Sequence, residues 1–123
     1  MENNYCKLYV GNLSNINDLL ECFRILFKLE EKQKEIKRDG VNLSIRTNED
    51  FDLHKQKNFP DGFLFFPYYI DVDFQIDAVG INIIASILNY LWSEGIAVIA
   101  SCDYEELLPK SGGYKDIQLP WPK

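Results

Sequence analysis

The sequence has few of the residues from which small catalytic and metal-binding sites are usually built. It contains one histidine, His54, and three cysteines, Cys6, Cys22 and Cys102, with no CxxC pair. This spacing excludes a Cys/His zinc site of the usual kind and argues against a disulfide framework. The cysteines lie in apolar sequence surroundings, so we expect free thiols that pack as small hydrophobic side chains.

Membrane and targeting signals are also missing. No run approaches the roughly 18 uncharged apolar residues that a membrane span requires. Residues 1–4 lack the basic and then apolar segments of a signal peptide, so we expect a cytoplasmic protein without membrane contact. The chain has 123 residues and 46% apolar content, which is typical of one folded domain, here residues 1–123. Residues 103–123 are predicted to be a C-terminal tail that packs on this domain.

Positive charge is absent from the middle of the chain. Residues 58–109 contain no Lys, Arg or His but carry eight acids, and the whole chain has a net charge of −6. The negative electrostatic field of such a stretch repels phosphate backbones and attracts basic surfaces. We therefore expect a basic protein partner and no nucleic acid.

The sequence predicts no catalytic or metal site. A Ser or Cys nucleophile needs an adjacent base, and the only candidate, His54, lies in a polar stretch far in sequence from Ser101 and Cys102. Two acids on an open strand lack a third ligand for a divalent ion. GxGxxG and P-loop sequences are absent as well. We expect neither an enzyme nor a cofactor.

Hydrophobic periodicity predicts the order βαββαβ. Strands are expected at residues 7–10, 41–45, 63–75 and 96–100, and helices at 16–29 and 77–94, with Asp77 as the cap of the second helix. The charged segment 30–38 is expected to extend the first helix until Asp39 and Gly40 end it. Pro67 should interrupt strand pairing. Right-handed crossovers then favour an α+β, ferredoxin-like sandwich: a four-stranded antiparallel sheet with two helices on one face.

Candidate partner-binding residues are the polar ones of the third strand and those that follow the last strand. In residues 63–75, Ile70 and Val72 alternate with polar residues that face the opposite way. Two alternatives stay open: the two groups form one patch, or they lie at opposite ends of the sheet and one of them is structural. The predicted partner-binding residues are Tyr69, Asp71, Asp73, Asp103, Glu105 and Glu106.

An alternative function is binding of single-stranded RNA. Residues 8–13, Leu-Tyr-Val-Gly-Asn-Leu, resemble the first-strand signature of an RNA-recognition motif, and residues 62–68 loosely resemble its third-strand signature, in which aromatic rings stack on bases. The second stretch departs from that pattern at three places. Asp61 stands where that family has Lys or Arg, Leu64 stands where it has a small residue, and Pro67 falls within the strand.

Residues 63–73, 91–95 and 101–109, together with Gly112, Gly113 and Tyr114, resemble a family of small bacterial immunity proteins. These proteins accompany polymorphic toxins, including those of contact-dependent growth inhibition. The likeness covers about residues 60–114. It implies a non-enzymatic inhibitor that binds the C-terminal domain of a cognate toxin and covers its active site. A nuclease toxin needs a basic cleft for phosphates, which an acidic surface would complement.

Overall fold

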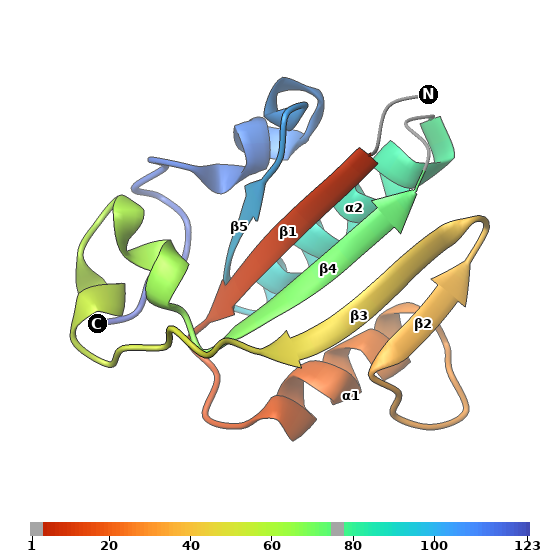
Figure 1. Cartoon of the computed structure of the whole chain (residues 1–123), viewed down its shortest axis with the longest axis horizontal. Helices are drawn as coiled ribbons and strands as arrows, with labels where there is room; N and C mark the ends of the chain where they lie inside the picture. Colours follow the sequence, from red (N-terminus) through yellow and green to blue (C-terminus); the bar gives the residue numbers. More distant parts are fainter. Residues whose placement is uncertain (1–3, 75–77) are drawn as a thin grey trace.

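A five-stranded antiparallel sheet forms the centre of the computed structural model, which describes residues 4–74 and 78–123 (Figure 1). The strands lie side by side in the order β2-β3-β4-β1-β5. The fold is therefore α+β, but the sheet has one strand more than the four predicted. The strands are β1 (Asn4–Gly11), β2 (Glu35–Arg38), β3 (Val41–Thr47), β4 (Tyr68–Phe74) and β5 (Ala97–Ser101).

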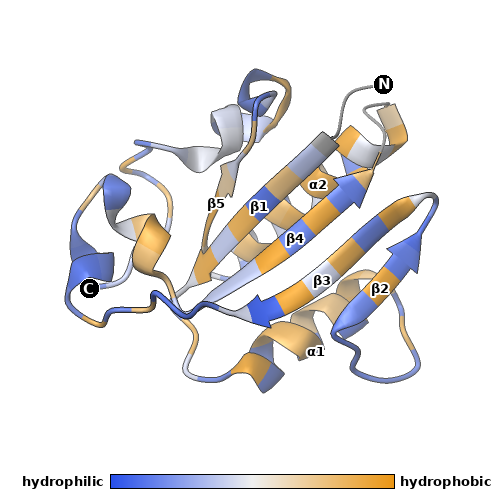
Figure 2. Cartoon of the chain, in the orientation of Figure 1, coloured by the Kyte–Doolittle hydropathy of each residue, from blue (hydrophilic) through white to orange (hydrophobic). Residues whose placement is uncertain are grey.

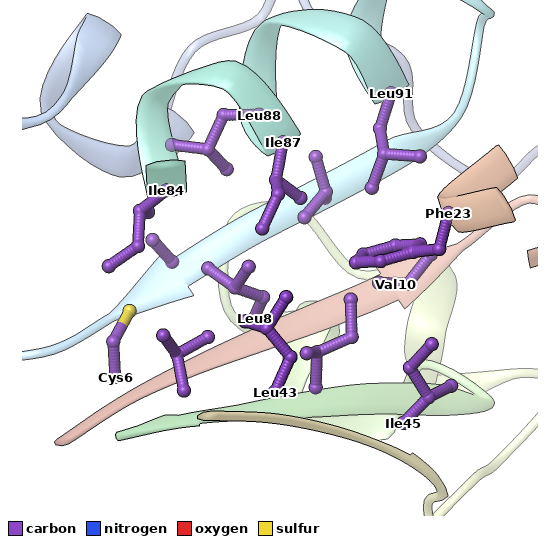
Figure 3. Close-up of a cluster of buried hydrophobic side chains, with 14 of the residues drawn as sticks. Cys6, Leu8, Val10, Phe23, Leu43, Ile45, Ile84, Ile87, Leu88 and Leu91 are labelled. Carbon is purple, nitrogen blue, oxygen red and sulfur yellow. The ribbon is translucent and has the colours of Figure 1, made fainter. Parts of the chain in front are cut away.

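Two helices, α1 (Ile16–Leu26) and α2 (Ala78–Ser93), cover one face of this sheet (Figure 1). Their apolar sides and the inward residues of the strands form one core (Figure 3). Strands β1 to β4 alternate between apolar and polar residues, which Figure 2 shows as alternating colours. The face opposite the helices, here called the open face, therefore carries the polar set. The predicted cap Asp77 lies outside the described residues.

The additional strand, β2, comes from the charged segment that was predicted to extend the first helix. The helix instead ends at Leu26, and Arg38 donates a hydrogen bond to the Phe27 carbonyl over 2.7 Å. Ile36 is only 2% exposed and pairs with Leu43 of β3. Asp39 and Gly40 have φ values of 53° and 83°, which is the two-residue hairpin turn that an Asp-Gly pair favours. The prediction was wrong because this turn was interpreted as a helix end.

Strand β4 begins later than predicted. Residues 63–65 belong to a short 3₁₀ helix, η2 (Asp61–Phe65), which follows η1 (Lys55–Lys57). Pairing starts only at Tyr68, directly after Pro67, so this proline precedes the strand and does not interrupt it as predicted. The end of the predicted strand, Gln75, lies outside the described residues.

Strand β5 lies at an edge of the sheet, yet four of its five residues are buried. Two short 3₁₀ helices follow it, η3 (Glu105–Leu107) and η4 (Pro109–Gly113). On the open face, Phe63, Phe66 and Trp121 pack against Ala97 and Ile99. The η2 segment and the C-terminal tail thus shield β5 from water on this face.

Among the described helices, none combines the length and the apolar character needed to cross a membrane.

Candidate partner-binding surface

The predicted residues of β4 lie on the open face. Tyr69 and Asp71 are half-buried and Asp73 is exposed, while Ile70 and Val72 between them are fully buried in the core. The alternation read from the sequence thus places these three side chains where a partner can reach them.

Asp71 sits in the middle of the sheet, between Lys7 of β1 and Ser44 of β3. The hydroxyl of Tyr5 donates a hydrogen bond to its carboxylate. Partial burial, and then the hydrogen bond to Asp71, raise the pKa of Tyr5 above its ordinary value. Tyr5 therefore stays protonated in the physiological range and remains a donor to Asp71.

Lys7 lies against two tyrosine rings of the same face. Its amine is 4.1 Å from the centre of the Tyr69 ring and 5.3 Å from that of Tyr9. The two rings are 6.4 Å apart. An ammonium group over an aromatic face is attracted by the ring's electrons. The arrangement holds the lysine along the sheet, where its charge offsets part of the negative charge of the neighbouring acids.

The acids that follow β5 border a hollow next to β1. The hollow has a volume of about 480 Å³ and is lined by Tyr5, Lys7, Ser101, Cys102, Asp103 and Glu105. Strands β4 and β5 are both antiparallel to β1, which lies between them. They therefore run in the same direction, and Asp73 and Asp103 come at the same end of the sheet.

Tyr5 joins the two predicted groups, because it bonds to Asp71 and also lines the hollow with Asp103 and Glu105. Glu105 in turn lines a second hollow of about 170 Å³ that also contains Asp61. The Tyr114 hydroxyl donates to Asp61 over 2.5 Å. We call this surface, made of Asp61, Asp71, Asp73, Asp103 and Glu105, the acidic strip. Glu106 is exposed on η3 but lines neither hollow.

Sequence reasoning missed Tyr5, Lys7 and Asp61. The first two could have been found, since Tyr5, Lys7 and Tyr9 alternate with the buried Cys6, Leu8 and Val10 in β1. Asp61 gave no such signal, because η2 has no strand periodicity and only the folded chain brings it near Glu105.

The other half of the open face, on β2 and β3, carries charges of both signs. Arg46 forms an ion pair with Glu35 over 3.1 Å, and both side chains are exposed. An exposed pair of this kind contributes little stability, but it neutralises the field locally. The negative field of the face is therefore concentrated on the side of β4, β1 and β5.

A further pocket, of about 540 Å³, lies at the opposite end of the sheet and contains none of the predicted site residues. Its wall is built around Asn48, whose amide donates to the carbonyls of Leu64 and Phe66 over 3.0 and 2.7 Å. Asn48 is thus a buried polar residue with satisfied hydrogen bonds, which indicates a structural role.

The part of the chain that the structure describes contains no group of three or more His, Cys, Asp or Glu side chains placed to hold a metal ion. His54 is exposed, and its backbone amide is bound by the Asp52 carboxylate.

The aromatic run that resembled an RNA-binding strand does not lie on a strand. Residues 63–65 are in η2, and Phe63 and Phe66 are buried against β5. This part of the interpretation was wrong because an apolar run without clear alternation fits a buried 3₁₀ turn as well as a strand. Tyr9, the aromatic residue of the first-strand signature, does lie on the open face beside Tyr69.

No protein-family model, curated protein or solved structure matches the chain. We therefore base the functional conclusion on the surface itself and on the resemblance described above.

Proposed function

We propose that this chain is an immunity protein that neutralises a cognate toxin in the cytoplasm by binding the toxin's basic C-terminal domain. The observation that carries the proposal is the acidic strip. Asp71 lies on one side of β1, and Asp103 and Glu105 lie on the other, within one face. Tyr5 borders both. The strip lies in the stretch of sequence without a basic residue.

The charge of the strip suits a nuclease domain, because such a domain carries a basic cleft for phosphate. Of the bases on the open face, Arg46 is paired with Glu35, while Lys7 lies over two tyrosine rings and its charge offsets one of the acids of the strip. Complementary charge raises association rates up to about 10⁸–10⁹ M⁻¹s⁻¹ at low salt and disfavours wrong partners.

The open face also offers the aromatic residues from which stable interfaces are made. Tyr5, Tyr9 and Tyr69 lie next to the acids, and tyrosine is enriched at interface hot spots. A standard interface covers about 800 Å² per partner, against a total accessible surface of 6945 Å² for this chain. An interface of that size would take roughly a ninth of the surface of the chain.

We also propose that the fold is a ferredoxin-like sandwich enlarged by one edge strand. The strands β5, β1, β4 and β3 are neighbours in that order, all antiparallel, and β2 lies outside β3. Removing β2 from consideration leaves the βαββαβ order that defines this sandwich.

The direct test is rescue of cells from the toxin. Under the proposal, the toxin is encoded immediately upstream, and co-expression of this chain should restore growth. The double variant Asp71→Lys/Glu105→Lys should fail to rescue. The control is Glu94→Lys, which makes one such charge reversal, half the change of the double variant, in the same base-free stretch, after α2 and outside the open face. Absence of rescue by the wild type, or equal loss in the control, would overturn the proposal.

A second candidate is binding of single-stranded RNA, favoured by one observation. Tyr9 and Tyr69 lie next to each other on the two central strands, with Lys7 over both rings. Base stacking on such rings contributes about 1–3 kcal/mol per base. A fluorescent oligonucleotide titrated at low salt separates the candidates. If the chain binds RNA, the wild type and Tyr9→Phe should bind the oligonucleotide and Tyr9→Ala should not. The immunity proposal expects no affinity of the wild type for the oligonucleotide.

A further inference from the structure

Cys6 and Cys102 stand opposite each other across two neighbouring chain segments. Lys7 of β1 pairs with Ser101, the last residue of β5, so the next residues outward along the two segments are Cys6 and Cys102. Opposite residues of antiparallel strands have Cα atoms about 4.5–5.5 Å apart. A disulfide spans about 4.4–6.8 Å between Cα atoms. Both cysteines are free, and each thiol shifts the pKa of the other, which places them side by side.

The two thiols differ in access to solvent. Cys6 is fully buried on the helix-covered side of β1 (Figure 3). Cys102 is half-buried and lines the 480 Å³ hollow beside Asp103. The hydrogen bond from the Cys6 thiol lowers the pKa of Cys102, while the same bond and burial raise the pKa of Cys6. An oxidant that enters the hollow thus meets the more reactive thiol first.

Tyr104 places an unused polar group next to this pair. Its hydroxyl is buried and has no well-formed hydrogen bond to any described residue, although it adjoins both thiols. The Tyr104 ring packs edge-on against Phe74 at 5.8 Å, which fixes its position. A buried hydroxyl without a partner is uncommon and costs stability. Here it can donate to a thiolate or to an oxygen attached to sulfur.

We propose that Cys6 and Cys102 form a redox-sensitive dithiol that a peroxide closes to a disulfide and a thiol reductant reopens. In the first step the Cys102 thiolate attacks hydrogen peroxide. An S–O bond forms, the O–O bond breaks, and the departing hydroxide becomes water by taking up the proton that Cys102 released to solvent on ionising. In the second step the Cys6 sulfur attacks the Cys102 sulfenic acid. The S–S bond forms, the S–O bond breaks, and the departing oxygen leaves as water with the Cys6 proton. The redox chemistry does not rest on the proposed partner binding, although Cys102 lines the hollow that Asp103 and Glu105 border.

The test uses the full reduced chain treated with a small excess of hydrogen peroxide. Remaining thiols are alkylated, and peptides are mapped by mass spectrometry without reduction. We expect a linked pair of peptides that contain Cys6 and Cys102, with the loss of two hydrogen atoms, and its disappearance after dithiothreitol. Cys22, on α1, should stay reduced, because burial raises its pKa. The matched control Cys22→Ser should therefore crosslink as the wild type does.

Three variants test the order of steps. Cys6→Ala, which keeps a small apolar group in the core, should stop at a Cys102 sulfenic acid that dimedone captures. Cys102→Ser should leave Cys6 reduced. Tyr104→Phe should slow the crosslink by about tenfold, the value of one hydrogen bond to a charged group.

The wild-type map alone can overturn the proposal, even if a variant fails to fold. It is overturned if Cys102 proceeds to sulfinic acid without the crosslink. It is also overturned if the oxidised product is a dimer joined through Cys22.

Discussion

The two faces of the sheet are made from alternate residues of the same strands, yet they differ in almost every property. On the helix-covered face, Leu8, Ile70 and Val72 have no exposed surface. On the open face, their chain neighbours are Tyr9, Tyr69 and Asp71, which are half-buried. Across β1 and β4, the covered face therefore supplies most of the buried apolar surface, whereas the open face has its own buried cluster only beside β5, around Phe66 and Ile99. Substitutions of adjacent residues should separate stability from binding.

The largest expected effect is on the covered face. Ile70→Ala should lower the free energy of unfolding by about 2–5 kcal/mol, because it leaves a cavity in a fully buried position. Tyr69→Ala, one residue earlier, should cost about 1 kcal/mol, since its ring is half in water and contacts mainly Lys7 and Tyr9. Urea unfolding followed by circular dichroism measures both. Equal losses would show that the open face also belongs to the stabilising core.

Two glycines allow a similar comparison with one added methyl group. A Cβ at Gly80 would lie 1.9 Å from the buried Phe74 ring on the helix side, whereas one at Gly11 would lie 3.0 Å from Phe66 on the open side. Gly80→Ala should destabilise the fold by about 1–3 kcal/mol, as overpacking does. Gly11→Ala should cost less, because a shift of a few tenths of an ångström relieves the contact. A larger loss of melting temperature in Gly11→Ala than in Gly80→Ala would contradict the tighter packing on the helix side.

Charge reversal should affect binding through the open face only. With the cognate toxin domain in hand, Glu105→Lys should slow association by about tenfold at low salt, and the difference should shrink as salt rises. Glu94→Lys, outside that face, should leave the rate unchanged. Stopped-flow or surface plasmon resonance at several salt concentrations gives the rates. A salt-independent rate in the wild type would argue against electrostatic steering.

The smallest effect concerns alkaline pH. Burial raises the pKa of Tyr104, and burial together with Asp71 raises that of Tyr5. Above the ordinary tyrosine pKa near 10, the unfolded chain loses protons that the folded chain keeps, so stability falls as pH rises. Tyr104 is 5% exposed and Tyr5 is 43% exposed. Tyr104→Phe should therefore flatten the alkaline decline in melting temperature more than Tyr5→Phe. The opposite ranking would mean that Asp71 and not burial dominates.

The parts of the fold with a clear period were predictable from the sequence. Alternation located the strand around Leu43, and helical spacing located both helices, because those patterns depend only on near neighbours along the chain. The segment before Asp39 was not predictable in the same way. Its mixed charges fit an exposed helix end and an exposed edge strand equally well, and a single apolar residue, Ile36, decided between them by entering the core.

The candidate surface also has a part that was predictable from the sequence and a part that was not. The sequence by itself determined that Tyr69, Asp71 and Asp73 share a face, since side chains of a strand alternate whatever the strand pairs with. It also determined that residues 58–109 are negative. Only the tertiary structure decided that Asp103 and Glu105 lie across β1 from Asp71, and that Tyr5 lies between them. Strand order depends on contacts between residues far apart in the chain, and no local pattern encodes those contacts.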